Sequence, residues 1–312
     1  MDNLTHTLAG SALAEAGLKH TTRFGTATLV VAANLPDIDG LSYLFGNGMD
    51  GLAFRRGWTH GVLAMVALPI LLAAAVFGWS RLVRQGGQAM RWKWLWLLAA
   101  LGVWSHPLLD LLNTYGVRLL MPFSSRWFYG DALFIVDPWV WGALGAGIAL
   151  SRWRARRSTG RARSGTPARV ALALTAGYAL GMTVASRAGA AAVERQAEGG
   201  PASRTLAAPV FGNPLRRDVI RDLDGRYELG QLSLGWHPRY TATAVRPTGR
   251  DDPDALLAAR TKDGASFLHW ARFPSFASER TGEHLAVTIS DLRYRSGNQR
   301  GQSWASVTVQ LR

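Results

Sequence analysis

The stretch Trp94–Leu112, with the sequence WLWLLAALGVWSHPLLDLL, decides the class of this protein. At a rise of about 1.5 Å per residue, a helix of this length crosses the roughly 30 Å hydrocarbon core of a bilayer. Three further windows are of similar length and apolar character: Gly61–Ser80, Leu133–Leu150 and Ala168–Ser186. The sequence therefore predicts an α-helical polytopic membrane domain with about four spans.

Residues 4–33 hold two shorter apolar segments ahead of these windows. Leu4–Leu18 is rich in Gly and Ala, which permit close contact between helices, and Gly25–Ala33 ends just before a proline. The pattern fits a re-entrant hairpin or a pair of short helices, one of which could be a short true span. We therefore expect N-terminal re-entrant or short helices in addition to the four spans.

The composition changes after Ser186. Residues 188–203 are small and polar, and they are predicted to link the membrane domain, residues 1–187, to a C-terminal domain, residues 204–312. We expect that domain to be small, soluble and mostly β. It contains no Cys, so its core rather than disulfides must stabilise it. The expected strands are Arg226–Leu234, Tyr240–Val245, Ala265–Phe273, His284–Ile289 and Trp304–Leu311.

The basic residues behind the net charge of +14 gather in particular loops. Arg81–Lys93 and Ser151–Arg169 are both rich in Arg and contain no acidic residue. The positive-inside rule places both loops in the cytoplasm, which leaves the C-terminal domain extracytoplasmic. An Arg-rich RNA-binding tract is the rival interpretation of residues 152–163. The charge asymmetry between loops favours the membrane topology, so the expected partner is the lipid bilayer and not a nucleic acid.

Three short polar islands interrupt the apolar N-terminal half, at residues 34–39, 55–60 and 105–110. His and Asp side chains left unpaired in an apolar setting are costly, so some partner must satisfy them. His106 and Asp110 are four residues apart in a helix and share one face. Under the predicted topology, the islands lie at the outer ends of their spans. The candidate metal ligands are His6, Asp37, Asp39, His60, His106 and Asp110, with Asp137 at the same level.

Each of these groups also has a purely structural interpretation. A single intramembrane His is most often a hydrogen-bonded structural residue, and the His–Asp pair could simply stabilise its helix. Asp37 and Asp39 could cap a turn, and Arg56 could neutralise them without any ion. The joint occurrence favours a divalent metal, with zinc ahead of manganese or iron, bound as one or two ions.

The motifs of residues 1–150 also resemble a known family. In order, they are Thr5-His6, Leu35-Pro36-Asp37-Ile38-Asp39, Arg56-Gly57-Trp58-Thr59-His60, His106-Pro107-Leu108-Leu109-Asp110, Tyr115-Gly116, Pro122-Phe123 and Asp137-Pro138. Together they are similar to the YdjM-like family of bacterial inner-membrane proteins, known as membrane-bound metal-dependent hydrolases. The resemblance implies a hydrolase of the bacterial inner membrane that depends on a divalent metal.

The chemistry expected at this site is attack by a metal-activated water. The chain has no Cys and no Gly-x-Ser-x-Gly motif, and Gly61 stands where many members of the family have Ser, so a covalent nucleophile is unsupported. We assign Asp39 as a ligand or general base and Arg56 as an oxyanion or phosphate clamp. The residues expected to orient the ligands are Thr5, Asn34 and Thr59.

The position of the site bears on the substrate. A site at the outer bilayer level favours a lipid-linked or amphiphilic phosphoester. Two other classes of protein stay open. A metal or proton transporter would also carry intramembrane His and Asp, but near the bilayer midplane on discontinuous helices. A non-catalytic assembly protein would work through its β domain, and its polar islands could be replaced with little loss.

Overall fold

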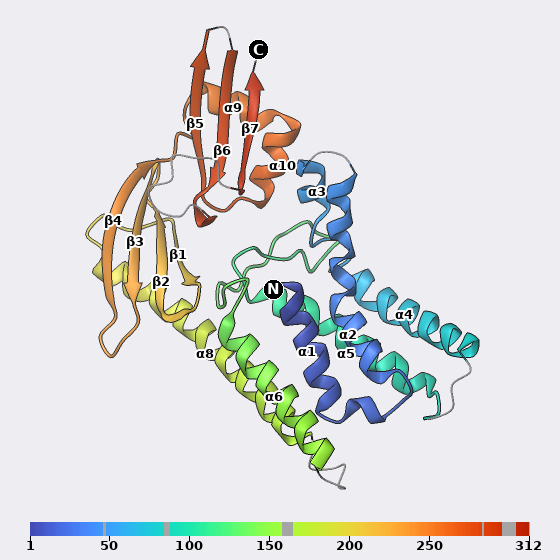
Figure 1. Ribbon diagram of the computed structural model, residues 1–312. Helices are drawn as coiled ribbons and strands as arrows, with labels where there is room; N and C mark the ends of the chain where they lie inside the picture. The colour runs from blue at the N-terminus through green and yellow to red at the C-terminus, as the bar shows by residue number, and fades with distance from the viewer. Residues whose placement is uncertain (46–47, 84–87, 158–164, 283, 295–303, 312) are drawn as a thin grey trace. The chain divides into compact units, whose positions relative to one another are not determined.

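A computed structural model describes residues 1–45, 48–83, 88–157, 165–282, 284–294 and 304–311 (Figure 1). The chain divides into two compact units. The first comprises Met1–Gly40 and Arg56–Thr183, and the second comprises Leu41–Arg55 and Val184–Arg312. The first unit is helical and the second is mostly β, as predicted. The boundaries proposed at residues 187 and 203 stay predictions.

The helical unit begins with short helices, as expected for residues 4–33. Asp2 caps the first of them, because its Oδ1 accepts hydrogen bonds from the amides of Leu4 and Thr5 at 3.0 and 3.1 Å. The elements of this unit, some of which extend into the other, are α1 Asn3–Glu15, η1 Leu18–His20, α2 Gly25–Asn34, η2 Leu35–Leu44, α4 Val62–Leu82, α5 Trp92–Leu111, α6 Pro138–Arg157 and α8 Thr166–Gln196.

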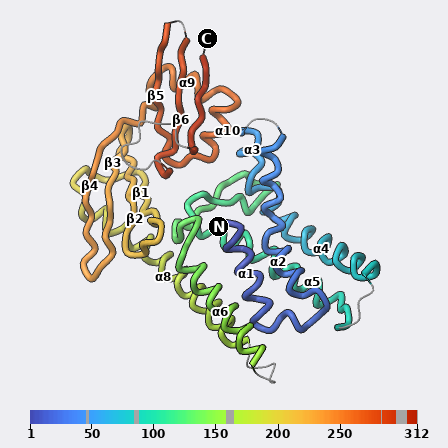
Figure 2. The backbone as a smooth tube through the Cα atoms, viewed as in Figure 1, coloured from blue at the N-terminus to red at the C-terminus, as the bar shows by residue number. Residues whose placement is uncertain are grey.

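Small residues bring α1, α2 and α5 into close contact (Figure 2). A Cβ atom on Gly10 of α1 would lie 2.8 Å from the carbonyl oxygen of Leu29 in α2. A Cβ atom on Gly102 of α5 would lie 2.4 Å from the Cβ of Ala32 in α2. Only glycine permits such approaches, so α2 packs directly against both neighbours. This packing brings the end of α2, the start of α1 and the last turns of α5 together.

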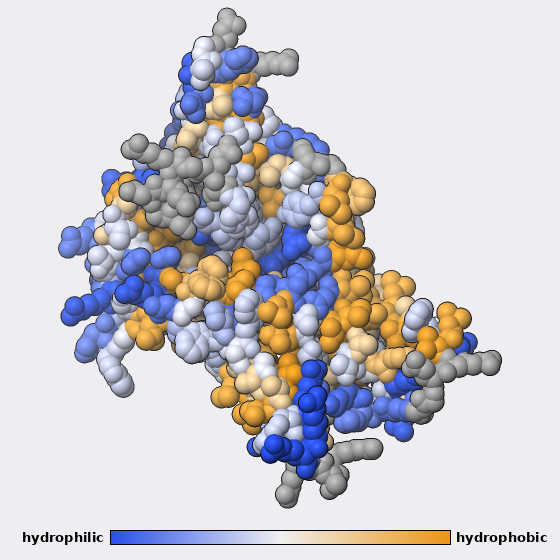
Figure 3. All heavy atoms as spheres, viewed as in Figure 1, coloured by the Kyte–Doolittle hydropathy of each residue, from blue (hydrophilic) through white to orange (hydrophobic). Residues whose placement is uncertain are grey.

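Among the described residues, three helices are long and apolar enough to cross a membrane: α4, α5 and α8. Side chains such as Val66 and Leu71 on α4 are more than half exposed, and Figure 3 shows apolar residues over this helix. Such a surface is expected to contact lipid rather than water. The predicted count of four spans is not confirmed, because α6 lies outside this set and its last turn carries Arg154, Arg156 and Arg157.

The second unit contains two antiparallel sheets. Their strands run in the orders β1-β2-β3-β4 and β5-β6-β7. The strands are β1 Arg204–Val210, β2 Asn213–Asp222, β3 Arg226–Ser233, β4 Arg239–Pro247, β5 Pro274–Thr281, β6 His284–Asp291 and β7 Ser306–Leu311. The other elements are α3 Gly48–Phe54, α9 Pro253–Arg260, α10 Lys262–Trp270 and η3 Leu292–Tyr294.

One expected strand is wrong. Most of Ala265–Phe273 lies in helix α10 instead. Thr261 caps this helix by accepting a hydrogen bond from the Gly264 amide at 3.1 Å. The buried side chains of Phe267 and Trp270 are three residues apart and share one face of the helix. The cap and the three-residue spacing outweighed the β propensity of the aromatic residues.

Candidate metal centre

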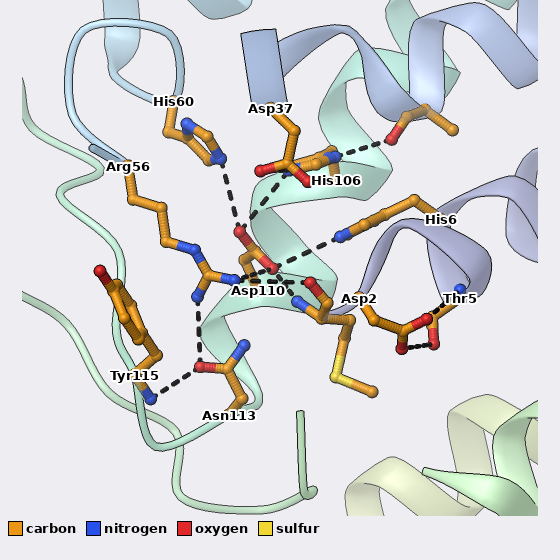
Figure 4. A network of polar contacts seen from close by, with 12 residues as sticks. Asp2, Thr5, His6, Asp37, Arg56, His60, His106, Asp110, Asn113 and Tyr115 are labelled. Carbon is orange, nitrogen blue, oxygen red and sulfur yellow. Dashed lines mark hydrogen bonds and ion pairs between the residues drawn. The ribbon is translucent and has the colours of Figure 1, made fainter. Parts of the chain in front are cut away.

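Four ligand atoms from three separate segments meet in the helical unit. They belong to Asp37, His60, His106 and Asp110 and lie within 4.8 Å of one another (Figure 4). The two His and Asp110 are fully buried, and Asp37 is nearly so. His106 and Asp110 lie on α5, Asp37 on η2 and His60 just before α4. This buried group of Asp and His side chains could bind a metal ion.

The backbone of α2 fixes the orientation of His106. Its Nδ1 lies 2.7 Å from the carbonyl oxygen of Ala33. A carbonyl oxygen can only accept a hydrogen bond, so Nδ1 carries a proton, and in the neutral ring that metal ligation needs Nε2 keeps its lone pair. That Nε2 points to Asp110 Oδ2 at 3.5 Å and to Asp37 Oδ1 at 3.7 Å. His106 therefore presents an acceptor to two carboxylates.

His60 is oriented by side chains on its other face. Its Nδ1 lies 2.9 Å from Thr59 Oγ1 and 3.3 Å from Asp39 Oδ2, and the Thr59 hydroxyl donates to the same Asp39 oxygen at 2.9 Å. Since that hydroxyl uses its proton on Asp39, it accepts from His60 Nδ1. Burial lowers the pKa of His60 to about 4, so its ring is neutral at pH 7. Nε2 then faces Asp110 Oδ2 at 3.4 Å with a lone pair.

The centre thus gathers acceptor atoms of His60, His106 and Asp110. Within the described residues, the Nε2 atoms of His60 and His106 and the Oδ2 atom of Asp110 have no hydrogen-bond partner. Buried acceptors in this position are destabilising unless a cation lies among them. Four ligands placed 2.0–2.1 Å from one ion in a tetrahedron would be separated by about 3.3–3.4 Å. Three of the six separations, 3.4, 3.5 and 3.7 Å, lie at or slightly above that spacing, and all six are within 4.8 Å.

The second oxygen of Asp110 is anchored by cations. Arg56 Nη2 lies 3.1 Å from Asp110 Oδ1, and the amino group of Met1 contacts the same oxygen. Arg56 also donates to the carbonyl oxygen of Gly116 and to Asn113 Oδ1, both at 3.3 Å. Asp110 therefore uses one oxygen for structure and directs the other to the ligand group. The ion pair of Arg56 with Asp110 was not foreseen, and the alternative in which Arg56 neutralises Asp37 and Asp39 stays a prediction.

His6 lies beside the four-ligand group. Its ring stacks on that of His106 with centroids 3.7 Å apart, and its Nε2 is 3.4 Å from Asp110 Oδ1. Neither ring nitrogen has a hydrogen-bond partner in the part of the chain that the structure describes. His6 is therefore close enough to support the centre, and its role as a ligand stays a prediction.

The other predicted residues occupy different positions. Asp39 lies behind His60, where its Oδ2 also accepts from the Arg56 amide at 2.6 Å. Thr59 contacts both Asp39 and His60, as expected for a group that orients a ligand.

Thr5 and Asn34 form their hydrogen bonds away from the ligand group. Thr5 bonds to Asp2 and Trp141. Asn34 bonds to Thr7 and the Val30 carbonyl. Asp137 caps α6 through the amides of Trp139 and Val140 and accepts from the Tyr178 hydroxyl.

Sequence reasoning missed Asn113 and the amino group of Met1. Asn113 Oδ1 accepts from Arg56 and from the amides of Tyr115 and Gly116 at 2.8 and 3.3 Å. It thereby shapes the turn after α5 and supports Arg56. The signal available in the sequence was a polar residue directly after the apolar window, three positions beyond Asp110. Met1 gives no comparable signal, because only the packing of α1 brings it to Asp110.

Comparison with known proteins gives three findings. A family model described as YdjM inner membrane protein matches residues 1–190. The uncharacterized protein YfhP of Bacillus subtilis (strain 168) is 27% identical over 171 residues, which cover 51% of this chain and 48% of YfhP. The inner membrane protein YbcI of Escherichia coli (strain K12) is 32% identical over 104 residues, which cover 32% of this chain and 54% of YbcI. The chain thus spans about half the length of these curated relatives, and no solved structure matches it.

Proposed function

The chain belongs to the YdjM inner membrane protein family, and from that membership and the ligand group we propose that it is a membrane-bound, metal-dependent hydrolase. The observation that carries the proposal is the set of buried acceptors on His60, His106 and Asp110. A mixed His and Asp set favours zinc, with manganese or iron as alternatives. One ion held by these three residues and Asp37 is compatible with ligand atoms within 4.8 Å of one another, and His6 Nε2 lies 3.4 Å from Asp110.

When bound, a divalent ion would lower the pKa of a coordinated water toward 7 and polarise the scissile bond. The protein's own residues prepare the site. Asp39 and Thr59 hold the ring of His60, and Ala33 holds that of His106. The guanidinium of Arg56 already pairs with Asp110. To act as a phosphate clamp, it would have to bind the substrate and Asp110 at the same time. Asp39 was assigned as a ligand or general base, and its position beside His60 Nδ1 and Thr59 favours a role in orienting His60.

The surroundings support an amphiphilic substrate, such as a lipid or lipid-linked phosphoester. Trp58 lies two residues before His60 and is half exposed, and Phe123 is 76% exposed. The amide of Val62, two residues after His60, donates to the Met121 carbonyl at 3.0 Å, which brings the Phe123 loop to the same segment. Apolar side chains beside a polar centre suit a substrate with an acyl chain and a charged head.

A metal or proton transporter is the second candidate, because buried His and Asp side chains also serve ion pathways. That class favours sites near the bilayer midplane on interrupted helices. Here His60 comes two residues before α4 begins at Val62, and Asp110 is the penultimate residue of α5. The helix-end position supports hydrolysis over transport.

The test of this function uses the full chain purified in detergent. We expect bound divalent metal, and hydrolysis of some members of a panel of phosphomonoesters, phosphodiesters and phospholipids. A chelator should abolish the activity, and zinc, manganese or iron should restore it. Metal retention with no hydrolysis across the panel, together with metal uptake into vesicles that contain the protein, would favour the transporter instead.

The proposed topology has four spans, with α6 as the third in chain order and the C-terminal domain outside. Reporter fusions at Gly86 and Gly160 should report the cytoplasm, since each lies in one of the two basic loops. Fusions at Gly116 and at the C-terminus should report the outside. A cytoplasmic C-terminus would overturn this topology: one span would be lost if Gly116 still reports the outside, and the metal centre would lie at the other face if Gly116 reports the cytoplasm.

Asp39→Asn separates the possible roles of this carboxylate. The amide can still accept from Thr59 and from the Arg56 backbone, but it no longer favours a proton on His60 Nδ1. We expect metal affinity to fall by about 10–100-fold while kcat at saturating metal changes little. A general base would give the opposite result, with metal affinity kept and kcat lower by about 10²–10⁴-fold. A competition titration with a chromophoric chelator, followed by kinetics, distinguishes the two.

A further inference from the structure

The connection between α5 and α6 exposes apolar side chains at a tight turn. The amides of Phe123 and Ser124 both donate to the Leu120 carbonyl, at 2.9 and 3.0 Å, and so close a turn over residues 120–124. Phe123 is 76% exposed and Leu120 43% exposed. We call residues 118–126 the Phe123 loop. Exposed apolar side chains that gather in one place mark a contact with a partner or a membrane.

The Phe123 loop packs along the segment that leads into α4. At one end of the contact, the Arg118 amide donates to the Arg56 carbonyl at 2.9 Å. At the other end, the Val62 amide donates to the Met121 carbonyl at 3.0 Å. A Cβ atom on Gly61 would lie 2.3 Å from that same carbonyl oxygen, so only glycine permits this approach. The loop and residues 56–62 therefore lie alongside each other.

This contact places the loop at one end of a candidate membrane span. Val62 is the first residue of α4, and Val62 and Leu63 are 41% and 52% exposed. These side chains begin the apolar surface of α4 that is expected to contact lipid. Trp58, which is 51% exposed, lies in the same segment, four residues before α4. The Phe123 loop and Trp58 thus extend this apolar surface beyond the end of the span.

The charge of the connection is positive over the same residues. Residues 112–130 contain Arg118 and Arg126 and no Asp or Glu. Arg126 is exposed, and its guanidinium carbon lies 5.4 Å from the ring centroid of Phe128. Aromatic residues beside arginine are typical of protein surfaces in the headgroup region of a bilayer, where arginine pairs with lipid phosphate. The composition of the loop therefore matches a lipid surface.

We propose that Trp58, Leu120 and Phe123 insert among the headgroups and upper acyl chains of the leaflet in which α4 begins, and that Arg126 pairs with lipid phosphate. His60 lies between Trp58 and the start of α4, so the insertion holds this candidate ligand at the depth of the lipid headgroups. The Phe123 loop is then a membrane anchor beside the candidate metal centre. Insertion requires no hydrolytic activity, so the proposal stands independently of the proposed function.

The absence of Cys from the chain allows a direct test, because each introduced Cys carries the only label. Leu120→Cys and Phe123→Cys, each labelled with a nitrobenzoxadiazole dye in the full chain, would be reconstituted into phosphatidylcholine and phosphatidylglycerol vesicles. Lipids with a nitroxide near the headgroup should cause about a twofold or larger loss of fluorescence at both positions. Aqueous iodide should quench both labels less than it quenches the free dye.

A pair of matched variants tests whether Phe123 causes the insertion. In the Leu120→Cys protein, Phe123→Asp should weaken quenching by the nitroxide lipids and increase quenching by iodide, because a carboxylate is repelled by lipid phosphate. Phe123→Leu keeps an apolar side chain and should leave both unchanged. Phe123 is exposed, so thermal unfolding in detergent should be the same for both variants.

Two results would overturn the proposal. In the first, the labels at 120 and 123 respond to iodide as the free dye does and ignore the nitroxide lipids. In the second, the labels are shielded from iodide only at high protein-to-lipid ratios. The second result would identify a second copy of the chain as the partner of this surface.

Discussion

Replacing His106 with alanine is expected to abolish both metal retention and hydrolysis while leaving membrane insertion intact. His106 offers its Nε2 to the centre of the ligand group, and its Nδ1 is already used by the Ala33 carbonyl. Disturbing residues behind metal ligands already lowers affinity by about 10–100-fold, and removal of a ligand should cost more. The substitution makes α5 more apolar, so insertion should proceed. Metal content of the purified protein and a membrane-fraction assay measure the two outcomes.

Matched controls for this prediction lie outside the centre. His237→Ala and His284→Ala remove exposed histidines of the second unit and should retain metal at the wild-type level. Asp110→Asn should also lose metal, because an amide oxygen is a poorer ligand than a carboxylate. Equal loss from His237→Ala would show that the metal lies in the other half of the chain. Full retention by His106→Ala would leave its ring with a structural role only.

The candidate metal ligands were accessible to sequence reasoning because their spacing has direct geometric consequences. His106 and Asp110 are four residues apart, which puts them on one face of any helix. His60 lies at the start of one apolar window and His106 near the end of another. The predicted topology therefore puts both residues at the same depth in the membrane. The position of Asp39 behind His60 could not be predicted, since it depends on where the loop before α4 meets η2. Because Asp37 and Asp39 are only two residues apart, their spacing predicts both equally as metal ligands.

The fold, too, could be predicted from the sequence only in part. Long apolar windows identify α4, α5 and α8 because bilayer thickness fixes their length. Whether a shorter segment forms a helix or a strand depends on competing local interactions. Phe267 and Trp270 suit a strand as well as a helix, and the cap at Thr261 decides between them. The sequence predicts close helix contacts only from its richness in small residues. It could not identify the partners of Gly10 and Gly102, because these partners are distant in sequence.

Replacing Arg56 with glutamine is expected to destabilise the metal-free protein by up to about 3–5 kcal/mol, because the buried Asp110 carboxylate loses its guanidinium partner and keeps the amino group of Met1 beside it. Arg56 is 3% exposed, and its guanidinium also lies 4.6 Å from the ring centroid of Tyr115. Arg56→Lys is the matched control. It keeps the charge but cannot reproduce the planar fork, so it should be intermediate in stability. Thermal unfolding of the three proteins in detergent with a chelator measures the effect.

The double variant Arg56→Gln/Asp110→Asn decides whether charge balance is the cause. Removing both charges leaves no uncompensated carboxylate, so part of the lost stability should return. Added metal should also stabilise Arg56→Gln, since binding to the native state supplies a cation to Asp110 by another route. A residue that served only to clamp the substrate would behave differently: unfolding would be unchanged and kcat/KM alone would fall. Unchanged stability in Arg56→Gln would therefore shift Arg56 from the support of Asp110 to the binding of substrate.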